Sequence, residues 1–186
     1  MVKVIRIFVV MTLLLAAFAS PAMAAHERPV KGTVTGEHGP PDFLKPDCPE
    51  WAVWRYSSEG VGRVSHLGRV EYTLTQCTVP GPEGIASEGT VKLVAANGDE
   101  LWLEHTMLSQ MTFGDEPGPP LGFTFVGTWE AVGGTGRFAH AVGRGMLDGA
   151  GDIPGGGAYF DGIPDGLLQL NLRGSIAYDA NDRSRR

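Results

Sequence analysis

The sequence predicts an all-β protein, a single eight-stranded antiparallel β-barrel that follows an N-terminal signal peptide. From Val30 onward, short runs rich in β-branched, aromatic and aliphatic residues alternate with clusters of turn residues. Two of these clusters, Asn97-Gly98 and the glycines at 133, 134 and 136, have the composition of hairpin turns. No segment after the signal shows convincing helical spacing. Eight strands can close into a barrel without exposed edges, and a two-sheet sandwich is the alternative that periodicity leaves open.

The first 24 residues have the composition of a cleaved export signal. Lys3 and Arg6 precede an almost unbroken apolar run, and Ala22-Met23-Ala24 supplies the small residues that a signal peptidase recognises. The apolar run is short for a transmembrane helix, and no later stretch approaches the roughly 20 apolar residues required. We therefore expect cleavage after Ala24 and a secreted or periplasmic protein without a membrane span; an uncleaved anchor is the alternative.

The charge balance argues against a nucleic-acid partner. Without Lys3 and Arg6, the chain carries 13 basic and 21 acidic side chains, a net charge of −8. Phosphate binding needs a basic footprint, and the only basic cluster lies in residues 181–186, which we expect to be a disordered tail. Residues 25–180 then form one barrel domain.

Three strands are predicted in the first half of the barrel. They cover 30–36, 51–56 and 61–77. Four prolines make 37–49 a loop, and 57–60 is a predicted turn. In the longest run, period-2 alternation places six residues on one face: Val64, His66, Gly68, Val70, Tyr72 and Leu74.

Cys48 and Cys77 are the only cysteines, and we expect them to form a disulfide. An exported chain meets an oxidising compartment, where an even pair usually bridges. The bridge closes a loop of 30 residues, for which the chain-entropy model gives roughly 3.5 kcal/mol of stabilisation. Neither cysteine has the CxxC spacing of a metal or redox pair.

Five strands are predicted in the second half. They cover 89–96, 99–107, 123–132, 137–147 and 168–178. A two-residue turn at Asn97-Gly98 places Leu93 opposite Trp102, and Ala96 opposite Asp99. Residues 79–87 and 107–121 are predicted loops, and 148–166 is a long glycine-rich, acidic loop.

Two segments carry a resemblance to known families. Residues 132–138 (VGGTGRF), followed by Ala141 and Gly143, resemble the glycine hairpin of plant dirigent proteins and, more loosely, of allene oxide cyclases. Residues 60–69 (GVGRVSHLGR), with 95–101 (AANGDEL) downstream, are similar to exported bacterial proteins of unknown function with an allene oxide cyclase-like barrel domain. The resemblance spans Val30 to Tyr178. It implies an eight-stranded antiparallel barrel, and such barrels often form dimers or trimers, so a homo-oligomer is expected.

The resemblance implies no particular activity. Dirigent proteins generally carry an arginine two residues after the position of His140, and this chain has Val142 there. Allene oxide cyclases use a glutamate near the start of the barrel, and nothing in 30–36 matches that motif, although Glu37 lies close by in sequence.

Four residues are candidates for binding a ligand. His66 and Tyr72 share the apolar face of the long predicted strand, where a histidine could orient a ligand or move a proton; a hydrogen-bonded structural histidine is the alternative. His140 and Arg144 share a parity on the strand after the glycines and could reach an anionic ligand together, or they lie on the solvated face. Phe138, Val142 and Met146 share that parity, a pattern that leaves an inward-facing strand face open as the alternative.

The other motifs indicate no catalytic or metal site. The five histidines form no zinc-ligand pair, and no GxSxG nucleophile motif occurs. The spacing of the loop aspartates does not match an EF-hand: these are Asp148, Asp152, Asp161 and Asp165. Residues 133–136 lack the lysine of a phosphate loop.

The leading expectation is an exported barrel that binds a small apolar or amphipathic molecule without catalysis and without a cofactor. It rests on the mostly aliphatic and aromatic inward faces and on the absence of an assembled catalytic set. The alternatives are an isomerase or cyclase that works by the shape of its cavity, and a structural or protein-interaction module.

Overall fold

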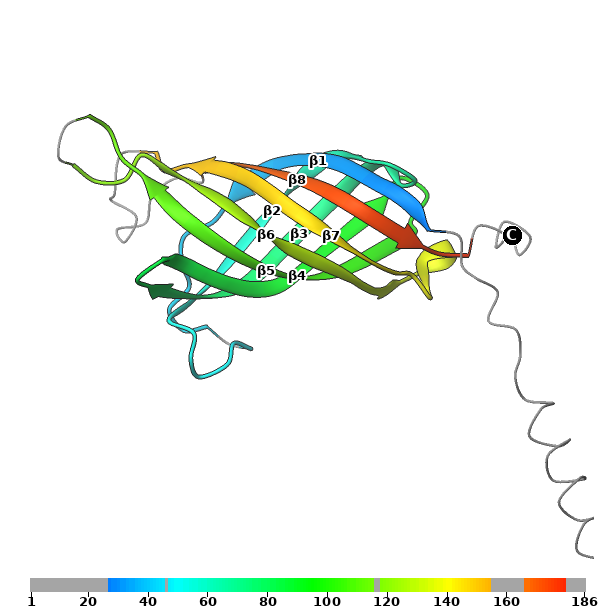
Figure 1. The fold of residues 1–186 in the computed structure, drawn as a ribbon, viewed down its shortest axis with the longest axis horizontal. Coiled ribbons are helices and arrows are strands. Elements are labelled where there is room, and N and C mark those ends of the chain that lie inside the picture. The colour runs from blue at the N-terminus through cyan, green and yellow to red at the C-terminus, as the bar shows by residue number, and fades with distance from the viewer. Residues whose placement is uncertain (1–26, 46, 116–117, 155–165, 180–186) are drawn as a thin grey trace, which may run out of the picture.

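The computed structural model describes residues 27–45, 47–115, 118–154 and 166–179, which form one closed antiparallel barrel of eight strands (Figure 1). The strands are β1 (Arg28–His38), β2 (Trp54–Val64), β3 (Gly68–Gly81), β4 (Gly84–Ala95), β5 (Glu100–Thr112), β6 (Gly122–Gly134), β7 (Val142–Asp152) and β8 (Gly166–Ala177). Each strand pairs with the next, and β8 pairs with β1. This confirms the predicted eight-stranded barrel and excludes the sandwich. The predicted signal peptide and basic tail lie outside the described residues.

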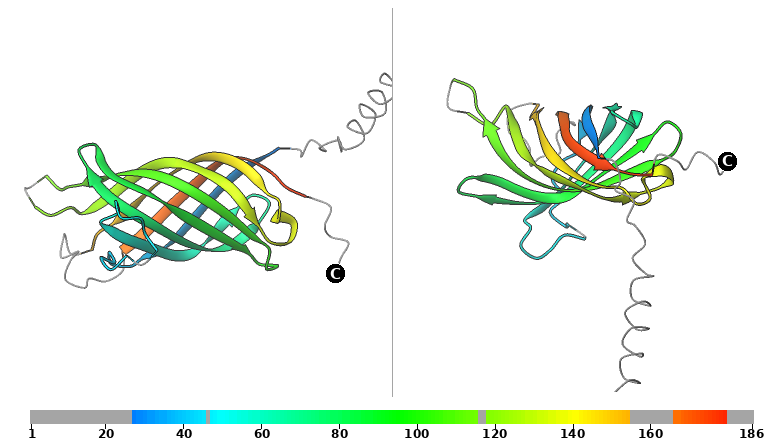
Figure 2. Two further views of the ribbon diagram at one scale, coloured as in Figure 1. Left: turned by 90° about the horizontal axis from the view of Figure 1, so that it is seen from below. Right: turned by 45° about the vertical axis from the view of Figure 1, so that its right-hand side comes forward.

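The two ends of the barrel differ, as the side views show (Figure 2). At one end, short turns join β2 to β3 and β4 to β5, and the 3₁₀-helix η1 (Gly136–Phe138) lies between β6 and β7. We call this the plug end. At the other, the loop end, lie the connections β1–β2, β3–β4, β5–β6 and β7–β8. Among the described residues, no helix has the length and apolar character needed to cross a membrane.

The plug end is filled by η1 and its neighbours. Phe138 is fully buried, and its ring centroid lies 4.8 Å from that of Tyr178. Beside it, Arg137 pairs with the Asp99 carboxylate at 3.4 Å and donates a hydrogen bond to the backbone oxygen of His66. Helix η1 is therefore tied to both neighbouring turns, and an aromatic ring closes this end.

Aromatic side chains fill the middle of the barrel because glycines on the facing strands leave room for them. Trp129 of β6 lies over Gly145 of β7 and Gly174 of β8, where an added Cβ would come within 2.7 Å of the indole ring in each case. The indole Nε1 donates to the backbone oxygen of Met146 at 3.1 Å. The many glycines of the sequence thus make room for large rings as well as forming turns.

The prediction of one continuous strand over 61–77 is wrong, because the chain turns within this range. His66 adopts φ 70° and Gly68 φ 77°, and this turn separates β2 from β3. The predicted turn at 57–60 lies in the middle of β2. With no Pro or Asn-Gly pair at 65–67, the turn had no strong sequence signal, whereas Gly60 and the two serines suggested one in the wrong place.

The predicted loop 79–87 is also wrong, since β3 and β4 extend through it to a two-residue turn at 82–83. Pro80 is tolerated near the end of β3, and Gly84 adopts φ 135° at the start of β4. The prolines and glycines here mark a tight hairpin rather than a loop.

The Asn97-Gly98 hairpin is present, but its predicted register is wrong by one residue. Leu93 lies opposite Leu101, and Lys92 lies opposite Trp102. The loop has three residues, 96–98, with Gly98 at φ 83°, as in a turn followed by a glycine bulge. Because a one-residue slip reverses the faces of a strand, Leu101 points into the core and Trp102 is exposed.

The predicted strand 137–147 begins later than expected. Residues 136–138 form η1, and β7 starts at Val142. Of the two alternatives for the even-numbered side chains of this strand, the structure shows the solvated face: Val142 and Met146 are exposed, and Leu147 is fully buried.

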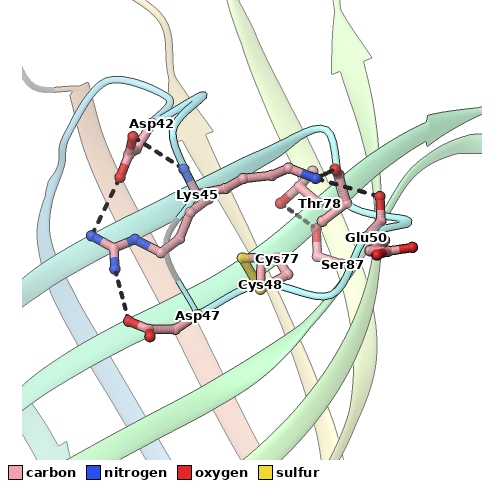
Figure 3. The surroundings of a disulfide bond; sticks show 10 residues. Asp42, Lys45, Asp47, Cys48, Glu50, Cys77, Thr78 and Ser87 are labelled. Carbon is pink, nitrogen blue, oxygen red and sulfur yellow. Dashed lines mark hydrogen bonds and ion pairs between the residues drawn. A yellow bond between two sulfur atoms is a disulfide. The ribbon is translucent and has the colours of Figure 1, made fainter.

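The disulfide between Cys48 and Cys77 is confirmed (Figure 3). It ties the β1–β2 loop to β3 near the loop end of the barrel. Arg55 of β2 adds ion pairs to Asp42 at 3.5 Å and to Asp47 at 4.0 Å, and the amines and carboxylates of the loop surround the disulfide in the figure. The longest described connection at this end is therefore held to the barrel wall.

Candidate functional site

The four ligand candidates predicted from the sequence do not come together. His66 lies in the β2–β3 turn at the plug end, where its Nε2 is 3.0 Å from the backbone oxygen of Pro29 and its ring lies against Tyr178. His140 and Arg144 are exposed, and Arg144 lies opposite Glu130 on the outer face. For His66 the structure thus shows the alternative of a hydrogen-bonded structural histidine. For His140 and Arg144 it shows the alternative of the solvated face.

Tyr72 lies inside the barrel and is almost fully buried. Its hydroxyl is 2.8 Å from Oγ of Ser58, which itself donates to the backbone oxygen of Glu37. Burial raises the pKa of the Tyr72 phenol, and the hydrogen bond with Ser58 offsets part of that effect. Tyr72 is thus a neutral, hydrogen-bonded residue of the core.

The loop half of the interior holds a set of buried polar side chains that the sequence analysis did not single out. They are His38, Tyr56, Ser58, Thr78, Ser87, His105 and Ser109. The plug half is apolar by contrast, with Val64, Val70, Leu101 and Ile176 buried there. Buried polar groups must find partners, so such a concentration at one end points to a site.

A small cavity of about 40 Å³ lies among these residues. Its walls come from β2 to β6: Trp54, Tyr56, Gln76, Thr78, Ile85, Ser87, Ser109, Met111 and Phe123. At roughly 10–15 Å³ for each water molecule, the space suits about three waters or one small polar group. None of the nine described lining residues is ionic, and the set combines apolar with hydrogen-bonding side chains.

Tyr56 is the lining residue with the best-defined hydrogen bond. Its hydroxyl is 2.8 Å from Nδ1 of His38, and Nε2 of His38 is 3.0 Å from the backbone oxygen of Asp152. A carbonyl oxygen can only accept, so Nε2 carries a proton. The imidazole of His38 therefore bridges the backbone of β7 and the Tyr56 hydroxyl at the cavity wall.

His105 of β5 is the most perturbed titratable group of this half. It is 4 % exposed, its Nε2 is 3.3 Å from Oε1 of Gln76, and its Nδ1 finds no hydrogen-bond partner among the described residues. Burial lowers the pKa of His105 to about 4, so the ring is neutral at physiological pH.

Acidification is expected to destabilise the barrel through His105. The folded pKa lies below the ordinary value of 6.5, so the unfolded chain binds the proton more readily, and the free energy of unfolding falls as the pH drops from 6.5 towards 4. The cost at pH 4 is about 3 kcal/mol. Urea unfolding of the wild type and of His105→Gln at pH 7.5 and 4 measures it: the wild type should lose that much more than the variant. The control is His140→Gln, which replaces an exposed histidine and should lose as much free energy of unfolding between pH 7.5 and 4 as the wild type. Equal losses for the wild type and His105→Gln would contradict this assignment.

The rim of the loop end exposes large apolar side chains. Phe43 is 51 % exposed, Phe113 63 % and Leu121 55 %. Phe43 also contacts the cavity wall, because its ring centroid lies 6.2 Å from that of Trp54. The disulfide-held loop therefore reaches from the outer wall to the cavity and carries an apolar surface beside it.

A larger groove of about 530 Å³ lies on the outer face of β3 to β6. Three glutamates line it, Glu88, Glu104 and Glu130, and the last two lie directly opposite each other on β5 and β6. Among the residues described, no three His, Cys, Asp or Glu side chains are grouped as metal ligands. The inner cavity, with buried polar groups and apolar walls, is the better candidate for a ligand site.

The acidic β7–β8 segment is described only in part. Asp148 pairs with Arg173 at 3.2 Å and accepts a hydrogen bond from Asn171, while a carboxylate oxygen of Asp152 accepts from the amide of Leu167. Both aspartates thus join β7 to β8. Asp161 and Asp165 lie outside the described residues.

The sequence offered a weak signal for the cavity. Several of its polar residues lie where a predicted element ends, so the alternation of inward and outward side chains could not be followed to them. Tyr56 ends the predicted strand 51–56, Thr78 follows the predicted strand 61–77, and Ser87 ends the predicted loop 79–87. His38 lies in a proline-rich stretch that appeared to be a loop. Extending β2, β3 and β4 to their true lengths would have placed these side chains on the inward faces.

Comparison with known proteins gives one structural likeness. No family model matches the chain, and no curated protein matches it. The structure is similar to that of the pterocarpan synthase dirigent protein GePTS1, with a TM-score of 0.43 and 11% sequence identity, over 86% of this chain and 90% of that chain. The fold rests on the strand pairing of this chain, which closes β1 to β8 into one barrel.

Proposed function

We propose that this protein is an exported β-barrel that binds a small, neutral, amphipathic molecule at the loop end, without catalysis. The observation that carries the proposal is the cavity lined by neutral hydroxyl, amide, aromatic and aliphatic side chains. The desolvation free energy of a buried ion is far larger than the hydrogen-bond energy that these neutral groups supply. A neutral ligand therefore suits the site.

The size of the cavity limits what enters it. A space of about 40 Å³ takes a single polar group. The apolar body of the ligand then lies outside, against the rim that Phe43, Phe113 and Leu121 expose. This division between a polar pocket and an apolar rim favours an amphipathic ligand over a purely apolar one.

Export is part of the proposal. The export-signal composition of residues 1–24 and the disulfide between Cys48 and Cys77 support it, because structural disulfides persist in oxidising compartments. A homo-oligomer, expected from the family resemblance, stays a prediction that sedimentation velocity measures.

Filling the cavity is expected to abolish binding. Ser109→Leu replaces a hydroxyl that lines the cavity by a branched group of three carbons. Titration with 1-naphthol, a neutral amphipathic fluorophore, should therefore show at least a tenfold loss of affinity, the effect of about 1.4 kcal/mol. Gln110→Leu is the matched control, because the neighbouring residue is exposed on the outer face of the same strand. Equal binding by the two variants, with circular dichroism confirming that both are folded, would place the ligand elsewhere.

A second function, that of an isomerase or cyclase, is favoured by one observation. The Tyr56 hydroxyl lies 2.8 Å from Nδ1 of His38, a phenol–imidazole pair of the kind that exchanges a proton, and the backbone oxygen of Asp152 holds the other side of the ring. Incubation of a copurified ligand with the protein distinguishes the two functions. An enzyme would convert it to an isomer of equal mass, and Tyr56→Phe would slow that conversion, whereas a binding protein would return the ligand unchanged.

A further inference from the structure

We infer that the Gln76 carboxamide holds the polar end of the ligand by donating a hydrogen bond to it, so that the group entering the cavity is an acceptor such as a carbonyl oxygen. The inference rests on the proposed binding function and specifies the chemical class of the ligand's polar end. It follows from which polar groups of the cavity wall already have partners within the barrel.

Several hydrogen-bonding groups of the cavity wall are paired with other protein groups. The Tyr56 hydroxyl lies 2.8 Å from a histidine nitrogen, and the hydroxyls of Thr78 and Ser87 lie 3.3 Å apart. Two lining groups, the amide nitrogen of Gln76 and the hydroxyl of Ser109, have no hydrogen-bond partner among the residues that the structure describes. Ser109 is only 8 % exposed. Because buried polar groups need partners, these two groups are the ones left for a ligand.

His105 orients the carboxamide of Gln76. Its Nε2 lies 3.3 Å from Oε1 of Gln76, and Gly89, which lies opposite both residues in the sheet, has no side chain to separate them. Nδ1 of His105 is buried and finds no partner within the described part of the chain. A buried N–H without a partner is rarer than an unpaired acceptor, so the proton of the neutral ring lies on Nε2. A charged ring would donate from the same atom, so Gln76 turns its oxygen toward His105 in either state.

The consequence for a ligand is directional. With the carboxamide oxygen engaged, the amide nitrogen is the branch of Gln76 left to the cavity, and it can only donate. Trp54 also lines the cavity, and its indole N–H likewise only donates. The Ser109 hydroxyl can rotate to donate as well. A carbonyl oxygen has two lone pairs and can accept from Gln76 and Ser109 together, whereas a ligand without an acceptor leaves these donors unpaired.

Acetophenone and α-methylstyrene test the inference, because they have the same shape and differ in a C=O against a C=CH₂ group. We expect calorimetric titration of the wild type to show acetophenone binding about tenfold more tightly, the effect of one hydrogen bond. Gln76→Met removes the donors and keeps an unbranched side chain of similar length. It should reduce the preference to about onefold while leaving the affinity for α-methylstyrene within about twofold. Gln169→Met is the matched control, since Gln169 is exposed on the outer face of β8, and it should keep the preference.

NMR of the side-chain amides gives a second readout that loss of folding cannot imitate. The NH₂ resonances of Gln76 are assigned by their absence from the spectrum of Gln76→Met. At saturation of the wild type, acetophenone should shift one of these protons downfield relative to α-methylstyrene. Equal affinities for the two probes, a preference retained by Gln76→Met, or equal Gln76 shifts with both probes would overturn the inference and leave the binding site standing. Saturable binding of neither probe would overturn the binding site and the inference with it.

Discussion

Replacing Phe138 by alanine is expected to lower the free energy of unfolding by about 4 kcal/mol, a loss in the range measured for buried phenylalanines. The ring is fully buried at the plug end, against Tyr178 and beneath the Arg137 guanidinium. Its removal leaves a hole that η1 can fill only by moving away from the Asp99 carboxylate to which Arg137 pairs. Urea unfolding at pH 7.5 measures the loss, and the melting temperature should fall by about 10 °C.

His140→Ala is the control for that prediction. His140 follows the same 3₁₀-helix but is exposed, so its truncation should change stability by less than about 0.5 kcal/mol. Similar losses for the two variants would mean that η1 contributes as a segment and that Phe138 does not close the barrel.

Removal of the disulfide by Cys48→Ala together with Cys77→Ala is expected to cost roughly 3.5 kcal/mol, because the unfolded chain regains the entropy of a 30-residue loop. The loss should fall on the β1–β2 loop first, since Cys48 is its covalent link to β3. Thermal unfolding under oxidising conditions measures the total effect. Hydrogen exchange at residues 42–55 measures the local one.

Reduction of the wild type provides the matched comparison for the disulfide. Added dithiothreitol should lower its stability to that of the double variant and leave the double variant unchanged. A double variant as stable as the oxidised wild type would show that the ion pairs of Arg55 with Asp42 and Asp47 suffice to hold the loop.

The number and order of the strands could be predicted because they depend on local pattern. β8 is the clearest case: Leu168, Leu170 and Leu172 alternate with polar residues, and the structure buries all three. The disulfide followed from compartment and cysteine count. Both inferences use information that one segment, or one residue type, carries by itself.

Strand ends and registers could not be predicted because tertiary pairing determines them. The Asn97-Gly98 signal is compatible with loops of two or three residues, and the choice reverses which of Leu101 and Trp102 enters the core. The turn at His66 has a left-handed residue that is not glycine, which propensity disfavours. The glycines at 133–136 predicted a simple hairpin, although they lead into a helical turn that carries Phe138 inward.

The candidate site was missed for a related reason. Its lining side chains come from five strands, and none of them stands out in its own segment of the sequence. His66 attracted attention because it shared parity with apolar residues in a strand that does not exist as predicted. His38 and Tyr56 are brought together by the pairing of β1 with β2, and Phe123 packs against the His38 ring.

Native mass spectrometry of the protein purified from its own host, followed by denaturing extraction, tests the central claim most directly. The account predicts a copurifying neutral molecule near one equivalent per chain, with a polar group at one end and an apolar body. The Ser109→Leu variant purified in the same way should lack it, and Gln110→Leu should retain it. A clean mass of the protein alone, unchanged after addition of lipid and aromatic extracts, would contradict the claim and leave a structural or protein-partner role for the barrel.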